Sequence, residues 1–89
     1  MKIAAIILNY NSAKDTMKCI EFLQKQKLNE ELHVIVVDNN SNEELGIRNE
    51  ELGMRSDIIY AEENRGYSAG NNIGLRRATE LGAKYALVI

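Results

Sequence analysis

The sequence predicts an α/β fold: a three-layer sandwich in which a mainly parallel sheet of about four strands carries helices on both faces. The clearest observation is Val34–Val37, four consecutive β-branched residues without polar alternation. Such a run is typical of a strand covered on both faces, as in a parallel sheet. A second unalternating apolar run, Ile3–Leu8, comes earlier, and residues at helical spacing lie between the two. Strand, helix and parallel strand are the repeating unit of this fold class.

Composition and charge limit the class of protein. The 89 residues suffice for one domain, with 45% hydrophobic and 27% charged residues and a net charge of −2. This charge gives no general attraction for nucleic acid or for anionic membranes. A single cysteine, Cys19, cannot form an internal disulfide, and no signal peptide or apolar run of membrane-spanning length is visible. We therefore expect a cytoplasmic location without a transmembrane segment, although a longer parent protein could lie peripherally at the inner membrane face.

The first strand is predicted over Lys2–Leu8. Ser12 is then suited to the N-cap of a helix, with Asp15 in the first turn, where the helix dipole favours an acid. The helix is predicted from Ala13 to about Lys27. Its apolar stripe at helical spacing is formed by Met17, Ile20 and Leu23 and is widened by Cys19 and Phe22.

The second strand is predicted over Leu32–Asp38, which makes the intervening helix a right-handed crossover. The later pattern is weaker. It indicates in turn a short irregular helix over Glu43–Arg55, a strand over Asp57–Ala61, a loop over Glu62–Ser68, a helix over Ala69–Leu81 capped by Gly82, and a strand over Ala83–Ile89. The final apolar residues, Y-A-L-V-I, end without a turn or polar tail, so we expect a fragment that stops within a strand.

Polar loops follow the first three strands, and in an open α/β sheet the carboxyl ends of the strands are where ligands bind. The loop N-Y-N-S-A-K after the first strand contains no glycine, which argues against a dinucleotide-binding G-x-G-x-x-G motif, and a P-loop is also absent. Tyr10 instead offers a ring that could stack on a nucleobase, and Asp38 can accept from a base N–H or a ribose hydroxyl. Arg65 and the glycines beside it suit a phosphate group.

Each candidate residue also has a purely structural interpretation. Tyr10 could cover the strand edge, and Asp38 with Ser41 could cap the following turn. The arginines Arg65, Arg76 and Arg77 could simply face water. His33 lies at a strand entrance with no second metal ligand near it, and Cys19 is expected to be a packing residue. Only the location of several candidates at one sheet edge favours a functional site.

Together, the motifs I-L-N-Y-N-S, V-V-D-N-N-S-N and N-R-G-Y-S-A-G-N-N-I-G closely resemble the amino-terminal half of family 2 glycosyltransferases, with rhamnosyltransferase-like members nearest. The resemblance covers essentially the whole chain. It implies the glycosyltransferase A fold, whose Rossmann-like half binds the nucleotide and precedes an acceptor-binding half. Residues 1–89 would be the nucleotide-sugar-binding part, and the parent enzyme would use a nucleoside diphosphate sugar donor and a saccharide or lipid-linked acceptor.

The resemblance also implies roles for particular residues. The expected nucleotide-sugar-binding residues are Asn9, Tyr10, Asn11, Asp38, Asn40, Ser41, Asn64, Arg65, Gly66, Gly70, Asn71 and Asn72. The family's acidic metal-binding motif and its catalytic base are not in this sequence. A divalent metal, Mn²⁺ or Mg²⁺, is therefore expected only for the full-length enzyme, with no catalytic or metal-binding residue in this fragment.

The parent reaction implied is displacement at the anomeric carbon with inversion, with polysaccharide biosynthesis as its setting. We expect the fragment to bind nucleotide without turnover, because one exposed arginine would not neutralise a leaving diphosphate. Two alternatives stay open. One is a Rossmann-type module that binds S-adenosylmethionine or a nucleotide, and the other is a non-enzymatic α/β domain that assembles through exposed strand edges.

Overall fold

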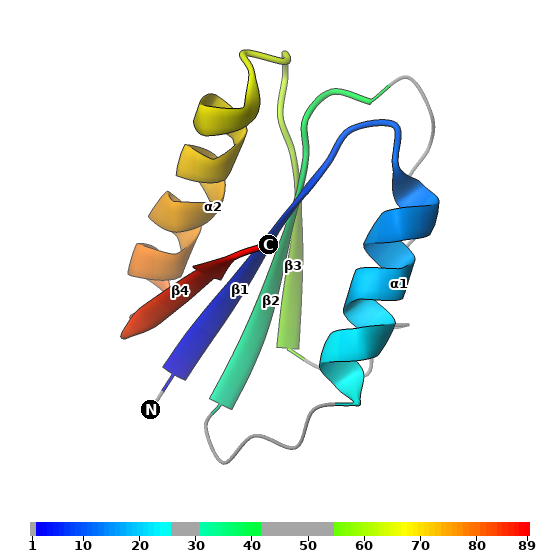
Figure 1. Ribbon diagram of the computed structural model, residues 1–89. Coiled ribbons are helices and arrows are strands. Elements are labelled where there is room, and N and C mark those ends of the chain that lie inside the picture. Colours follow the sequence, from blue (N-terminus) through cyan, green and yellow to red (C-terminus); the bar gives the residue numbers. More distant parts are fainter. Residues whose placement is uncertain (1, 26–30, 42–54) are drawn as a thin grey trace.

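A computed structural model describes residues 2–25, 31–41 and 55–89. Its elements in chain order are β1 (Lys2–Asn9), α1 (Ala13–Gln24), β2 (Glu31–Asp38), β3 (Arg55–Tyr60), α2 (Tyr67–Glu80) and β4 (Tyr85–Val88) (Figure 1). The strands form one sheet of order β3-β2-β1-β4, and every neighbouring pair is parallel. The expected parallel α/β fold is confirmed. The irregular helix expected over 43–55 lies outside the described residues, except that Arg55 begins β3.

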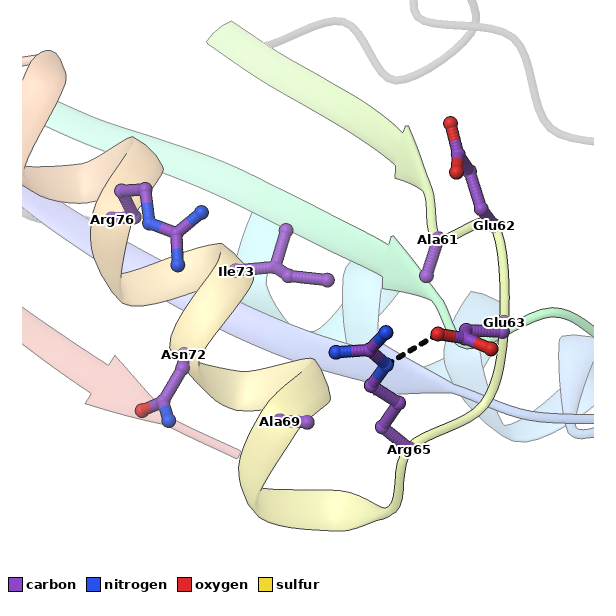
Figure 2. A pocket seen from close by; sticks show the side chains of 8 residues that line it. All are labelled: Ala61, Glu62, Glu63, Arg65, Ala69, Asn72, Ile73 and Arg76. Carbon is purple, nitrogen blue, oxygen red and sulfur yellow. Dashed lines mark hydrogen bonds and ion pairs between the residues drawn. The ribbon is translucent and has the colours of Figure 1, made fainter.

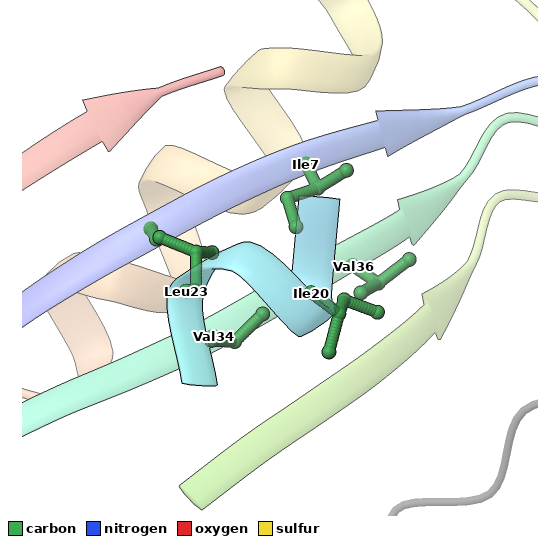
Figure 3. Close-up of a cluster of buried hydrophobic side chains, with 6 residues drawn as sticks. Ile7, Ile20, Leu23, Val34 and Val36 are labelled. Carbon is green, nitrogen blue, oxygen red and sulfur yellow. The ribbon is translucent and has the colours of Figure 1, made fainter. Parts of the chain in front are cut away.

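The two helices lie on opposite faces of the sheet (Figure 1). Alternate residues of β1 and β2 supply the two cores because successive side chains of a strand point to opposite faces. The core under α1 consists of Ala5, Ile7, Ile20, Leu23, Val34 and Val36, most of which Figure 3 shows. The core under α2 consists of Ala4, Ile6, Ile35, Val37 and Ala78. This explains why β1 and β2 are apolar without alternation: both faces are covered.

Helix α1 differs from its prediction at two places. It ends at Gln24, with Lys25 as its C-cap residue, rather than near Lys27. Phe22 does not widen the buried stripe, because 63% of its surface is exposed. Cys19 packs against the core under α1, as expected, and burial raises the pKa of its thiol.

Helix α2 begins two residues earlier than predicted, after Gly66 at its N-cap. Its end confirms the predicted glycine cap. Gly82 has a φ of 76°, and its N–H donates to the Thr79 carbonyl while the N–H of Ala83 donates to the Ala78 carbonyl. These two bonds form a Schellman motif, which satisfies carbonyls of the last turn.

Strand β4 is an edge of the sheet, and all four of its residues are exposed. Among the described residues, neither helix is long and apolar enough to cross a membrane.

Candidate nucleotide-binding edge

A buried polar network joins the ends of β1 and β2. Asn9 and Asp38 are partners in the parallel register, and the Asn9 Nδ2 donates to Asp38 Oδ1 at 2.8 Å. The Ser41 hydroxyl donates to the same oxygen at 2.7 Å, while its backbone N–H donates to Asp38 Oδ2 at 3.2 Å. Through these hydrogen bonds Asp38, which is only 6% exposed, holds the β2 loop in a turn. This is the turn-capping role that the sequence left open for Asp38 and Ser41.

The other end of the Asn9 amide fixes the start of α1. Its Oδ1 accepts from the Thr16 hydroxyl at 2.6 Å and from the Ser12 hydroxyl at 3.3 Å. Ser12 occupies the predicted N-cap position, but its side chain makes no capping hydrogen bond to the helix. The expected side-chain cap is therefore wrong: the Ser12 hydroxyl bonds to groups of the β1 loop, including the Asn9 amide, and not to a backbone N–H of the helix. Asn9 itself is 0% exposed and acts as a scaffold beneath the edge.

The loops after β1 and β2 are sharply bent and bonded to each other. Asn11 and Asn40 have φ of 50° and 59°, a left-handed conformation that asparagine tolerates better than most residues. The Asn11 N–H donates to the Ser41 hydroxyl oxygen at 2.9 Å across the two loops. Tyr10, 46% exposed, stands at this junction. The loop after β1 therefore carries an aromatic side chain that is partly open to solvent.

A second link joins the β2 loop to the loop between β3 and α2. The Asn39 Nδ2 donates to Asn64 Oδ1 at 3.0 Å, and that oxygen also accepts from the Gly66 N–H at 2.8 Å. Asn39 is 3% exposed. Two backbone hydrogen bonds also join the ends of the three strands. The Asn39 N–H donates to the Asn9 carbonyl and the Ala61 N–H to the Asp38 carbonyl, both at 2.8 Å. All three loops are therefore held at one edge, at the top of Figure 1.

The glycine-rich start of α2 serves helix packing. A Cβ at Gly70 would lie 2.5 Å from Leu8 Cδ1, so the absence of a side chain lets α2 approach β1. Gly66 has a φ of 98°, a conformation that requires glycine to enter the helix. Asn71 is buried with no partner for its Oδ1, whereas Asn72 is exposed. Of these residues, Gly70 and Asn71 lie inside the fold rather than on its surface.

Beside this edge, an open pocket of about 410 Å³ lies between the β3–α2 loop and one face of α2 (Figure 2). Its lining residues are Ala61, Glu62, Glu63, Arg65, Ala69, Asn72, Ile73 and Arg76. Arg65 forms an ion pair with Glu63, and both side chains are largely exposed. Only Arg65 and Asn72 among these were expected to bind nucleotide.

A third polar cluster lies away from the strand ends. The Asp57 Oδ2 is 2.9 Å from His33 Nε2 and accepts from Arg77 Nε at 3.0 Å. Burial would raise the pKa of Asp57, but hydrogen bonds and charges from Arg77 and His33 outweigh it and lower that pKa. The interpretation of Arg77 as a residue that faces water is therefore wrong, because the guanidinium ties α2 to β3.

The described residues contain no group of three histidine, cysteine or acidic side chains able to hold a metal ion. Asp38, the one acid among the candidates, already accepts from three protein donors. The part of the chain that the structure describes therefore does not fit the divalent metal that the resemblance implies for a full-length enzyme.

The predicted site residues thus divide into a connected network, an exposed rim and a buried helix start. The network contains Asn9, Asn11, Asp38, Ser41, Asn64 and Gly66. Sequence reasoning missed the linking roles of Thr16 and Asn39. Asn39 lies within the D-N-N-S run that marked this strand end as a candidate site, whereas Thr16 lies on a helix face with no motif to mark it.

The parallel order, the two helical layers and the polar carboxyl edge define an open, Rossmann-like α/β fold. A structure of the mannosyltransferase PcManGT from Pyrobaculum calidifontis, in complex with GDP-Man and Mn²⁺, has the same fold with a TM-score of 0.75 at 22% identity. The match covers 85% of this chain and 24% of that one, so the chain spans about a quarter of the solved protein.

The profile of the family described as "Glycosyl transferase family 2" matches residues 4–86, nearly the whole chain. The chain belongs to this family, as its three loop motifs predicted. A search among curated proteins gave no match.

Proposed function

We propose that this chain is the nucleotide-sugar-binding part of a glycosyltransferase that moves a sugar from a nucleoside diphosphate donor to an acceptor hydroxyl with inversion. The observation that carries this proposal is the convergence of three loops, held by the Asn9–Asp38–Ser41 network and the Asn39–Asn64 bond. Family membership and the fold shared with a mannosyltransferase solved with GDP-Man support the donor class.

In this proposal Tyr10 stacks on the nucleobase, since its ring is exposed at the junction of the β1 and β2 loops. Asp38 has about four acceptor positions on its two oxygens. Three are used by Asn9 and Ser41, which leaves about one for a base N–H or a ribose hydroxyl. Asn9 positions this carboxylate and does not touch the ligand. Asn40, on the exposed side of the same turn, completes the rim.

Diphosphate binding is proposed for the start of α2, with Arg65 as the one cation of the adjoining loop and Asn72 on the exposed surface of the helix. The ligands of the divalent metal and the carboxylate base would be residues outside these 89. Nucleotide binding without sugar transfer is therefore the activity that we propose for this chain. When bound, the metal would neutralise the leaving diphosphate.

Calorimetric titration with GDP, UDP, dTDP and S-adenosylmethionine tests this function. We expect a nucleoside diphosphate to bind and S-adenosylmethionine not to. Tyr10→Ala should weaken nucleotide binding about tenfold, because stacking on an aromatic ring contributes roughly 1–3 kcal/mol per base. Tyr85→Ala, which removes another exposed ring on β4, should leave the affinity unchanged. Binding of S-adenosylmethionine alone, or equal losses in the two variants, would contradict the proposal.

Association through the exposed β4 edge stays a prediction, which light scattering at increasing protein concentration checks.

A further inference from the structure

One face of α2 and the loop before it enclose the open pocket of about 410 Å³. The helix contributes Ala69, Asn72, Ile73 and Arg76, whose spacing of three, four and seven residues places them on one face. The loop from Ala61 to Arg65 forms the opposite wall. A volume of this size falls in the range of small-molecule sites, roughly 300–1,000 Å³. None of the linked residues Asn9, Asp38 and Ser41 lines it.

The two arginines of the pocket differ in their hydrogen-bond and ion-pair partners. Arg76 makes no hydrogen bond or ion pair with any residue that the structure describes. Arg65 is paired with Glu63, but both side chains are largely exposed, with relative accessibilities of 75% and 59%, and exposed pairs of this kind are weak. Figure 2 shows Arg65 and Arg76 extending from opposite walls toward the space faced by Ile73, while Glu62 points away from Arg65.

We propose that this pocket is a second binding site, which adjoins the nucleotide edge and shares Arg65 with the proposed diphosphate site, and which takes the oxyanion of a small sugar acid or sugar phosphate between Arg76 and Arg65. Guanidinium groups are well suited to carboxylate and phosphate because their N–H donors match two oxygens at once. Ile73, Ala61 and Ala69 supply the apolar surface against which the carbon skeleton packs. The incoming oxyanion replaces Glu63 as the partner of Arg65.

The test is an NMR titration of this chain, which follows the Nε–H signals of the arginines and the methyl signals of Ile73. The probes are glucose 6-phosphate, glucuronate, inorganic phosphate and neutral glucose. We expect at least one sugar anion to move the Arg65, Arg76 and Ile73 signals, while glucose moves none of them. Stronger binding of glucose 6-phosphate or of glucuronate identifies the anionic group. Movement by inorganic phosphate alone, or by none of the anions, would overturn the proposal.

Three variants test whether the pocket binds the anion through specific contacts or only through the overall charge of the chain. Arg76→Gln should weaken binding at least about fivefold, because it removes a guanidinium that has no partner among the described residues. Glu63→Gln should tighten binding about twofold, because it releases Arg65 and removes a competing charge. Lys18→Gln makes the same charge change as Arg76→Gln on an exposed position of α1 and should have no effect. Equal weakening by Lys18→Gln and Arg76→Gln would contradict the assignment.

Added GDP, UDP or dTDP distinguishes this proposal from the nucleotide-binding function. At least one of them should move signals of Asp38–Ser41 whether or not the sugar anion is present. Failure of all three to bind, with the Arg76 response intact, would reject the nucleotide site and leave the second site standing.

Discussion

The Asn9 Nδ2 lies 2.8 Å from the Asp38 Oδ1, and these two residues are register partners at the last pair of the β1–β2 ladder. One hydrogen bond therefore connects the point where two strands end to the point where two loops begin. The same amide accepts from Thr16 on α1, so strand, loop and helix positions depend on one buried side chain. The candidate nucleotide-binding edge is built around this asparagine.

Asn9→Ala should lower the free energy of unfolding by about 2–4 kcal/mol. The substitution removes a donor from the buried Asp38 and leaves the buried Thr16 hydroxyl without its acceptor, and each unsatisfied buried group costs about 1–3 kcal/mol. Urea denaturation measures the change. Asn72→Ala is the matched control: Asn72 is exposed within α2, so the same substitution there should stabilise slightly. A loss at Asn9 no larger than at Asn72 would show that the network contributes little.

Gly74→Ala should destabilise the chain although alanine favours helices. The new Cβ would meet three atoms of the buried Ile6 side chain, with the nearest, Cγ2, at 2.5 Å. Overpacking costs about 1–3 kcal/mol, against a gain of about 1 kcal/mol in helix propensity. Gly70→Ala should cost less, because its closest neighbour is the flexible end of Leu8. Thermal unfolding of both variants checks this order, and a more stable Gly74→Ala protein would disprove the close approach of α2 to β1.

Asn64→Ala should loosen the loop between β3 and α2. It removes the acceptor shared by the Asn39 amide and the Gly66 N–H. We expect faster amide hydrogen exchange at Gly66 and weaker nucleotide binding, while the amides of strand β2 stay protected from exchange. Exchange measured by NMR, with Asn40→Gly as a control in the neighbouring turn, tests this. Glycine suits the left-handed conformation of Asn40, so the control should not change exchange at Gly66.

Stability should depend on pH through Asp57. Its pKa is lowered in the folded chain, so the folded state favours the ionised carboxylate more than the unfolded state does. This contribution is complete above the ordinary aspartate pKa and is lost as the pH falls through the lowered value. Asp57→Asn should therefore be less stable than the parent at neutral pH, and the difference should shrink in acid. Urea denaturation between pH 7 and strongly acidic pH follows it. A difference independent of pH would mean that the ion pairs do not account for the effect of the substitution.

The fold could be predicted from sequence because its signals are local. The β-branched run Val34–Val37 and the apolar run Ile3–Leu8 have no polar alternation, and both became strands covered on two faces. Element ends were less well predicted: α2 begins at Tyr67 because Gly66 adopts a φ of 98°, which the letters N-R-G-Y do not specify.

Side-chain partners were the part that sequence could not supply. Arg77 was interpreted as facing water, yet its partner Asp57 is twenty residues away on β3. Ser12 was assigned to a helix cap because hydroxyls at that place commonly cap, whereas the buried Asn9 amide competes for its hydroxyl. The Arg77 contact arises only once α2 packs beside β3, whereas Ser12 and Asn9 lie three residues apart. The family motifs predicted which loops meet, but not which of their residues lie beneath the surface.

Nucleotide binding at the edge formed by the three loops is tested most directly by an NMR titration of the assigned chain with GDP, UDP and dTDP, each with and without Mg²⁺. We expect that at least one nucleotide shifts amide signals confined to Asn9–Asn11, Asp38–Ser41 and Asn64–Asn72, and that Asn9→Ala weakens or abolishes this response. Shifts centred on another part of the molecule, or a well-dispersed spectrum indifferent to all three nucleotides, would contradict it.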